Sequence, residues 1–231
     1  MGRDHKASHH ARGLHRIARP HRLAAILALL FAMSSAAQSQ GVPGASVNAD
    51  AAPMGTPLAR PAPGEPVTYL HVAPIFAARC AKCHTENGLK GPPPEGYRLT
   101  SYEAALTGSA RARIIPGSPK ASELVRRIRG EAQPRMPFDG PPYLDSEEIR
   151  LIEDWIAQGA RNADGKALRP TPGVAVRLHG TMRAGGRLDG LDLLVGPRTR
   201  VDKVPASGAY VEVHGILDDK GRVVVEHLRP R

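Results

Sequence analysis

The chain of 231 residues contains two cysteines, and both lie in one short run, Cys80-Ala81-Lys82-Cys83-His84. A Cys-x-x-Cys-His run is typical of the attachment site of a c-type haem. Two thiols three positions apart on one helical turn can each form a thioether with a vinyl group of the same porphyrin, and the histidine that follows is held beneath the iron. The sequence therefore predicts one covalent haem c, with thioethers at Cys80 and Cys83 and with His84 as the proximal iron ligand.

A redox dithiol and half of a zinc site are the alternatives for a lone Cys-x-x-Cys pair. A thioredoxin-type dithiol lies in a βαβ context, and no such pattern surrounds residues 80–84. A structural zinc site needs a second pair of ligands, and the chain contains no further cysteine. The sequence therefore favours haem attachment over both alternatives.

The first 37 residues have the pattern of an export signal. Residues 1–22 carry six Lys/Arg against one acidic residue, and the apolar run 23–33 is followed by small residues around Ala36 and Ala37. This order predicts a signal peptide at 1–37, with an uncleaved N-terminal anchor as the alternative. The rest of the protein is then periplasmic or otherwise exported, and no apolar run is long enough to form a membrane span after cleavage.

The predicted signal peptide changes the meaning of the net charge. The whole chain has a net charge of +10, whereas residues 38–231 carry 26 Lys/Arg and 21 Asp/Glu, a net charge of +5. These charges are spread along the chain, and aromatic residues make up only 4% of it. Because a nucleic-acid surface needs clustered basic residues and stacking aromatics, no nucleic-acid partner is expected. A mildly basic face remains that suits redox partner proteins with acidic faces.

Composition and periodicity divide the remainder of the chain into four segments. Residues 38–66 are rich in Ala, Gly, Pro, Ser and Gln and have no periodicity, which predicts a disordered linker. Residues 67–161 have helical periodicity, residues 162–173 form a second linker rich in Pro and Gly, and the period then becomes two. The expected fold class is multi-domain α + β, with an all-α haem domain at 67–161 and a small all-β barrel at 174–231.

Capping signals place four helices in the helical segment. Ser101 is an expected N-cap, and Asp145 with Glu148 has the pattern of a capping box. Pro119 suits the first position of a helix that Gly130 ends. The expected helices cover 68–79, 101–107, 118–129 and the stretch between Asp145 and Gly159.

The distal iron ligand follows from the scarcity of methionine. Met136 is the single methionine between residues 67 and 161, and it lies in the run Gln133-Pro134-Arg135-Met136-Pro137. Neighbouring prolines favour an extended loop that presents a side chain at a fixed distance, and a thioether opposite a histidine raises the potential of a haem. The sequence therefore predicts Met136 as the distal ligand. The alternatives are a methionine that only fills the core and ligation by His71, on the helix before Cys80.

Short motifs between Phe76 and Ala160 form a wider pattern. They are Phe76, the Cys80-to-His84 run, Pro116-Gly117-Ser118-Pro119, the helix at 122–128, Arg135-Met136-Pro137, Leu144 to Ile149, Trp155-Ile156 and Gln158-Gly159-Ala160. On these residues the stretch 67–161 resembles class I-like cytochromes c, most closely planctomycete-type cytochrome c domains. The resemblance implies an all-α haem fold whose first and last helices cross, so that Phe76 meets Trp155. Phe138 departs from the family, whose members commonly have a second proline there.

The C-terminal segment contains an internal repeat. The residues Val176-x-Leu178-His179-Gly180, followed by Gly186-Arg187-Leu188, recur 35 positions later as Val211-x-Val213-His214-Gly215 and Gly221-Arg222-Val223. Each copy predicts two strands joined by a turn, and about five short strands with glycines at bends suggest a small closed barrel that resembles the OB-fold. His179 and His214 occupy equivalent positions, but a metal site there lacks a third ligand, so solvent-facing histidines are expected.

Together these patterns favour a periplasmic c-type cytochrome with one haem, His/Met ligation and one-electron transfer. An electron carrier is expected rather than an enzyme, because the sequence shows neither an open sixth site nor a distal acid–base pair. The alternatives are a haem-based redox or gas sensor and a haem subunit of a larger oxidoreductase complex, with the β-barrel as a docking module.

Overall fold

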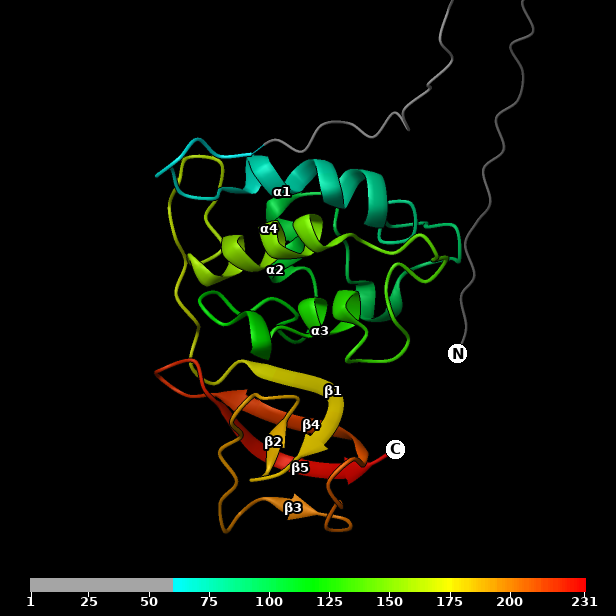
Figure 1. The fold of residues 1–231 in the computed structure, drawn as a ribbon, viewed down its shortest axis with the longest axis vertical. Helices are drawn as coiled ribbons and strands as arrows, with labels where there is room; N and C mark the ends of the chain where they lie inside the picture. Colours follow the sequence, from blue (N-terminus) through cyan, green and yellow to red (C-terminus); the bar gives the residue numbers. More distant parts are fainter. Residues whose placement is uncertain (1–59) are drawn as a thin grey trace, which may run out of the picture. The chain divides into compact units, whose positions relative to one another are not determined.

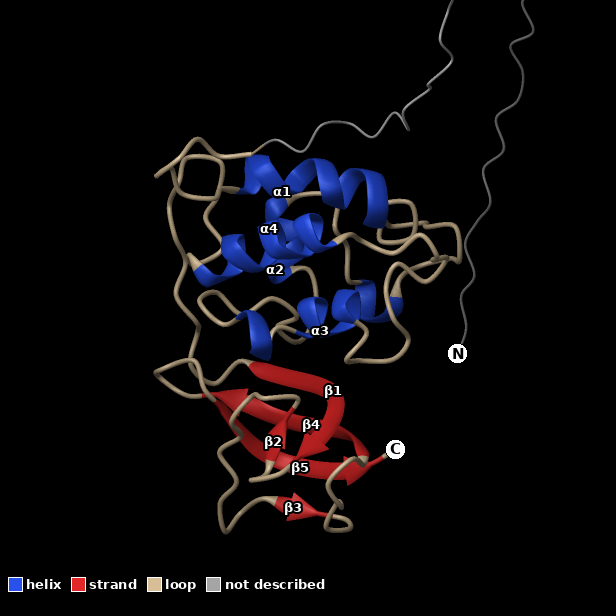
Figure 2. Ribbon diagram, in the orientation of Figure 1, coloured by secondary structure: helices blue, strands red, loops and turns tan. Residues whose placement is uncertain are grey.

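The computed structural model describes residues 60–231 (Figure 1). The predicted signal peptide at 1–37 and most of the predicted linker at 38–66 lie outside the described residues. Helices occupy the first half of the described chain and strands the second half (Figure 2), which confirms the expected α + β class. None of the helices within 60–231 is long and apolar enough to cross a membrane.

The helical half contains four α-helices and three shorter helical turns. Their bounds are α1 Tyr69–Ile75, η1 Phe76–Cys80, η2 Pro94–Gly96, α2 Tyr102–Thr107, η3 Pro119–Ala121, α3 Glu123–Arg129 and α4 Ser146–Ala157. The predicted caps are confirmed, because Ser101 Oγ accepts a hydrogen bond from Ala104 N at 3.1 Å and Asp145 forms its capping box with Glu148. The π-helical turn η1 continues α1 directly, so that one helical rod ends at Cys80.

The helix expected at 118–129 is divided in two at Ser122. The backbone of Ser122 is extended, and it separates the 3₁₀ turn η3 from α3. The Ser122 hydroxyl accepts a hydrogen bond from Ile115 N at 2.8 Å and donates one to Ser118 O at 2.9 Å. Such local side-chain bonds compete with helical backbone bonds, and this explains the break. Gly130 ends α3 as predicted, with φ of 79°.

The helical half packs around Trp155, which is fully buried. The centroids of the Phe76 and Trp155 rings lie 5.9 Å apart in an edge-to-face arrangement, as the resemblance implies. Tyr69 N donates a hydrogen bond to Arg161 O at 2.9 Å, and Trp155 Nε1 donates to the same oxygen at 2.8 Å. The start of α1 is thereby joined to the chain that follows α4.

The strands form one five-stranded sheet in the order β2-β1-β4-β5-β3. Their bounds are β1 Ala175–Arg183, β2 Arg187–Leu188, β3 Arg200–Val201, β4 Tyr210–Leu217 and β5 Val223–Pro230. The two copies of the repeat pair with each other, since β1 lies antiparallel to β4 with His179 opposite Glu212. The sheet is open rather than a closed barrel, because each edge strand has only two residues and β2 is not paired with β3 in the described chain. Closure would need longer strands with a continuous register.

The helix α3 contacts strand β1 (Figure 1). The apolar core of the sheet includes Ile115 and Ala121 from the helical half. Arg126 on α3 is fully buried, and its Nη2 donates to Asp189 Oδ2 at 2.6 Å while its Nε donates to His179 O at 2.7 Å. The helical half and the sheet therefore share buried contacts. The domain limits at 161 and 174 stay predictions.

Gly180 lies at this contact and leaves no room for a side chain. A Cβ at Gly180 would lie 2.0 Å from Arg126 Nη2 and 2.3 Å from Asp189 Oδ2. The glycine in the first copy of the repeat thus permits the close approach of a buried ion pair. Its counterpart Gly215 lies at a register shift of β4, where a Cβ would be 2.3 Å from Val224 O.

Candidate functional site

A cavity of about 600 Å³ lies beside the end of η1. This volume is within the range of small-molecule and cofactor sites. Cys80, Cys83, His84 and Met136 all line it. The structure thus brings the four predicted site residues together at one cavity, although Met136 comes from a distant part of the chain.

The Cys-x-x-Cys-His run forms a single helical turn. Cys83 N and His84 N both donate to Cys80 O, at 3.1 Å and 2.9 Å. Both cysteines are free thiols, and burial raises the pKa of Cys80 to about 12. Because a reactive redox dithiol needs a lowered thiol pKa, this turn is better suited to holding two thiols for attachment than to dithiol chemistry.

His84 is oriented by the backbone of the chain opposite it. Its Nδ1 donates to Tyr97 O at 2.9 Å, and this bond leaves Nε2 available as a metal ligand. Burial lowers the pKa of His84, which favours the neutral imidazole that metal binding requires. The ring of His84 also lies edge-to-face with the ring of Tyr97, at a centroid distance of 5.7 Å.

Met136 is held at the cavity by a backbone hydrogen bond to α3. Its N donates to Arg127 O at 3.0 Å, and its side chain packs against the helical core. The competing ligand His71 accepts a hydrogen bond from Thr68 N at 2.9 Å through Nδ1, and it is not among the residues that line the cavity. In the described chain the only other methionine, Met182, is buried in the core of the sheet.

The cavity wall combines apolar side chains with hydrogen-bond donors. Phe76, Leu99 and Ile152 are among its apolar residues. Tyr97 and Arg113 also line the cavity, and Tyr97 Oη and Arg113 Nε are both buried without a hydrogen-bond partner among the described residues. Burial raises the pKa of Tyr97, so its hydroxyl stays a donor. Two thiols, an imidazole, a thioether, apolar walls and unpaired donors together fit a haem, which is a flat apolar ring that bears carboxylates.

The sequence does not predict the charged part of this wall, which includes residues of the C-terminal sheet. His179 was expected to face solvent, but its Nδ1 lies 2.9 Å from Glu123 Oε1 and its Nε2 lies 3.4 Å from Glu212 Oε2. Arg177 shares its face of β1, as alternation along a strand requires. The alternation of side chains along the strand is the one sequence signal that could place Arg177 and His179 together, and it does not reveal which residues of the helical half they contact.

Within 60–231 no three His, Cys, Asp or Glu side chains are grouped so as to hold a metal ion.

Comparison with known proteins gives one match. Residues 80–140 match the family model of planctomycete cytochrome C. No curated protein and no solved structure matches the chain. The matched residues include both cysteines, His84 and Met136, which are the residues that meet at the cavity. Motif, cavity and family match agree, and together they support a planctomycete-type cytochrome c domain that includes residues 80–140.

Proposed function

We propose that this protein is an exported, periplasmic electron carrier with a single haem c. The observation that carries the proposal is the cavity at which Cys80, Cys83, His84 and Met136 meet. The haem, when bound, supplies one-electron chemistry at its iron. In this proposal Cys80 and Cys83 would hold the ring as thioethers, and His84 and Met136 would be the ligands of the iron.

The protein's own residues set the conditions for this chemistry. Tyr97 O fixes the orientation of the His84 ring, and Arg127 O fixes the backbone of Met136. The apolar residues of the cavity exclude water, which influences the potential of a bound metal. Fixed ligands and a dry site reduce the structural change that accompanies electron transfer, and this is the property that an electron carrier needs.

The first test concerns covalent attachment. After expression with a periplasmic haem-maturation system, acidic organic solvent should leave the haem on the wild-type protein and extract it from the double variant Cys80→Ala/Cys83→Ala. Haem that is lost completely from the denatured wild-type protein would contradict the proposal. The His84→Ala variant should yield no stable holoprotein, because attachment and proximal ligation depend on the same turn.

The second test concerns the distal ligand. We expect Met136→Ala to retain covalent haem, to lose the far-red absorption band of sulfur-ligated ferric haem and to bind carbon monoxide. Its potential should fall by more than about 59 mV, a tenfold change in the relative stability of the ferrous state, because a thioether favours ferrous iron. Met182→Leu in the sheet core is the matched control and should keep the wild-type potential.

Carbon monoxide binding also distinguishes an electron carrier from the alternative, a gas sensor. A wild-type protein that binds carbon monoxide, lacks the sulfur band and has the same potential as Met136→Ala would exclude Met136 as a ligand. The open iron of such a protein would favour the sensor.

A further inference from the structure

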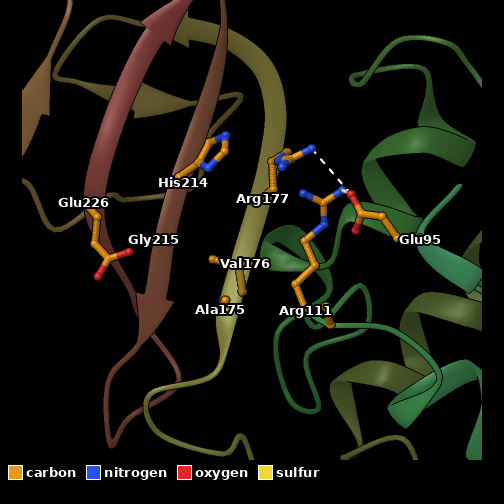
Figure 3. A pocket seen from close by; sticks show the side chains of 9 residues that line it. Glu95, Arg111, Ala175, Val176, Arg177, His214, Gly215 and Glu226 are labelled. Atoms are coloured by element: carbon orange, nitrogen blue, oxygen red, sulfur yellow. Dashed lines mark hydrogen bonds and ion pairs between the residues drawn. The ribbon is translucent and has the colours of Figure 1, made fainter.

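Three arginines converge on one carboxylate at the edge of the cavity. Arg111 and Arg113 both form ion pairs with Glu95, the latter at 3.0 Å, and Arg177 Nη1 lies 3.5 Å from Glu95 Oε1. Figure 3 shows Arg111 and Arg177 both directed toward Glu95. We call these four residues the Glu95 cluster. Since an arginine is always charged, one carboxylate leaves an excess of two positive charges in the cluster.

The acidic residues near the Glu95 cluster are engaged by other groups. Glu123, whose charge acts on Arg111, forms an ion pair with Arg127 and lies 2.9 Å from His179 Nδ1. Glu212 Oε1 lies 3.6 Å from Arg177 Nε, but Glu212 already accepts hydrogen bonds from His214, Arg229 and Arg231. Burial, together with the neighbouring charges of Arg113 and Arg177, lowers the pKa of Arg111. The guanidinium groups therefore repel one another, and an additional anion would relieve that repulsion.

Two buried donors of the cluster have no acceptor within hydrogen-bond distance. Arg113 Nε and Arg177 Nε are both buried without a hydrogen-bond partner among the described residues, and both arginines line the large cavity. A buried donor without an acceptor is costly. Glu95 itself has φ of 57°, a left-handed conformation that is uncommon for a non-glycine residue. The unpaired donors indicate a site that receives an acceptor from outside the chain.

The position of the cluster identifies which part of a ligand it would meet. A second, more open pocket of about 320 Å³ is also lined by Glu95, Arg111 and Arg177 (Figure 3). The cluster thus borders both the apolar cavity beside the Cys-x-x-Cys-His turn and a second space that is more open to solvent. An apolar ring in the cavity would present its charged substituents at such a boundary. A guanidinium group matches a carboxylate in both charge and geometry.

We propose that the Glu95 cluster binds a carboxylate of the cofactor, so that Arg177 makes the C-terminal sheet a part of the cofactor site. The inference rests on the proposed function for the identity of the cofactor, since haem carries two carboxylates and the cluster has an excess of two positive charges. Arg177 lies on β1, outside the residues 80–140 that match the cytochrome family. The sheet would then be a binding element, in addition to any role in docking.

The inference is tested by measuring how tightly the protein binds a porphyrin that is not covalently attached. The full-length variant Cys80→Ala/Cys83→Ala is titrated with haemin and with haemin dimethyl ester, which has the same ring but no carboxylate charge. We expect haemin to bind about tenfold more tightly than the ester. Adding Arg177→Gln should weaken haemin binding about tenfold and leave ester binding unchanged, and Arg177→Lys should retain part of the preference.

Arg183→Gln is the matched control, because Arg183 is an exposed arginine on the same strand that lies away from the cavity. This control should leave both affinities unchanged. Equal binding of haemin and ester, with no effect of Arg177→Gln, would overturn the inference while leaving the proposed function intact. Absence of binding by either ring, together with a wild-type protein that attaches no haem, would overturn both.

The covalent holoprotein provides a second readout. Removing a positive charge beside the haem favours the ferric state, so Arg177→Gln should lower the reduction potential relative to wild type and Arg183→Gln. A potential equal to that of the control would count against the Glu95 cluster as a carboxylate site.

Discussion

Gly180 occupies a point at which the helical half and the sheet approach too closely for any side chain. The Gly180→Ala variant should force the Arg126–Asp189 ion pair apart, because the new Cβ would overlap both partners. Separating a buried ion pair is costly, so the free energy of unfolding should fall by about 3 kcal/mol. Urea denaturation measures this loss. Gly196→Ala is the control, since its Cβ would meet nothing within 4 Å; equal midpoints for both variants would contradict the prediction.

The roles of single residues could be predicted from the sequence where the residues of a site are close together in the chain. Cys80, Cys83 and His84 lie in one helical turn, so the motif alone indicates their joint role. The Glu95 cluster could not be predicted, because it combines a turn before α2, the segment after α2 and strand β1. Nothing in a single sequence relates Arg177 to Glu95, and the start of β1 reaches this region through a backbone hydrogen bond from Ala112 N to Ala175 O.

Strand β4 contains the fully buried carboxylate Glu212. Burial alone would raise the pKa of Glu212, but hydrogen bonds from His214, Arg231 and Arg229 hold it well below its ordinary value of 4.5. A carboxyl group with a lowered pKa in the folded state stabilises the protein above its ordinary pKa, and this stabilisation is lost as the pH falls toward the lowered value. The ionised Glu212 and its hydrogen bonds therefore stabilise the folded protein at neutral pH, and this stabilisation is lost in acid.

The Glu212→Gln variant should accordingly be less stable than wild type by about 2 kcal/mol at pH 7. The difference should narrow as the pH falls below about 4.5, because the unfolded wild-type chain then binds a proton at Glu212 that the folded protein, with its lowered pKa, does not bind. Urea denaturation at a series of pH values measures both quantities. Glu226→Gln, which changes an exposed residue on β5, should show no such convergence; a difference independent of pH for Glu212→Gln would contradict the assignment.

Helices and strands could be predicted from the sequence where the residues that determine their ends lie within a few positions of one another. The caps at Ser101 and Asp145 act over three residues, and each begins its helix as expected. The break at Ser122 depends on a hydrogen bond from Ile115 N, outside the helix, so periodicity could not reveal it. Alternation likewise predicts strands, but it does not show whether a sheet closes, which depends on the length and register of the edge strands.

Across the whole described molecule, the segment 162–173 is expected to be a linker, yet the halves on either side of it share buried contacts. Ile115 and Ala121 belong to the core of the sheet, and Gln133 N donates to Tyr210 Oη at 2.6 Å. Limited proteolysis within 162–173 should therefore leave the two fragments associated. A single peak with both fragments is expected in size-exclusion chromatography, and it should split in moderate urea. Immediate separation without denaturant would show that the contacts are too weak to hold the halves together.

The hydrogen bond from Tyr69 N to Arg161 O has a consequence for protein engineering. A segment whose first and last residues are adjacent can be inserted into a loop of another protein without separating the two ends of that loop. Residues 67–161 meet this geometric condition, so transplantation requires no long spacers. The surface to redesign is the one that the sheet covers. Ile115 and Ala121 would each need a polar replacement or a new covering element, and Arg126 would need a new partner in place of Asp189.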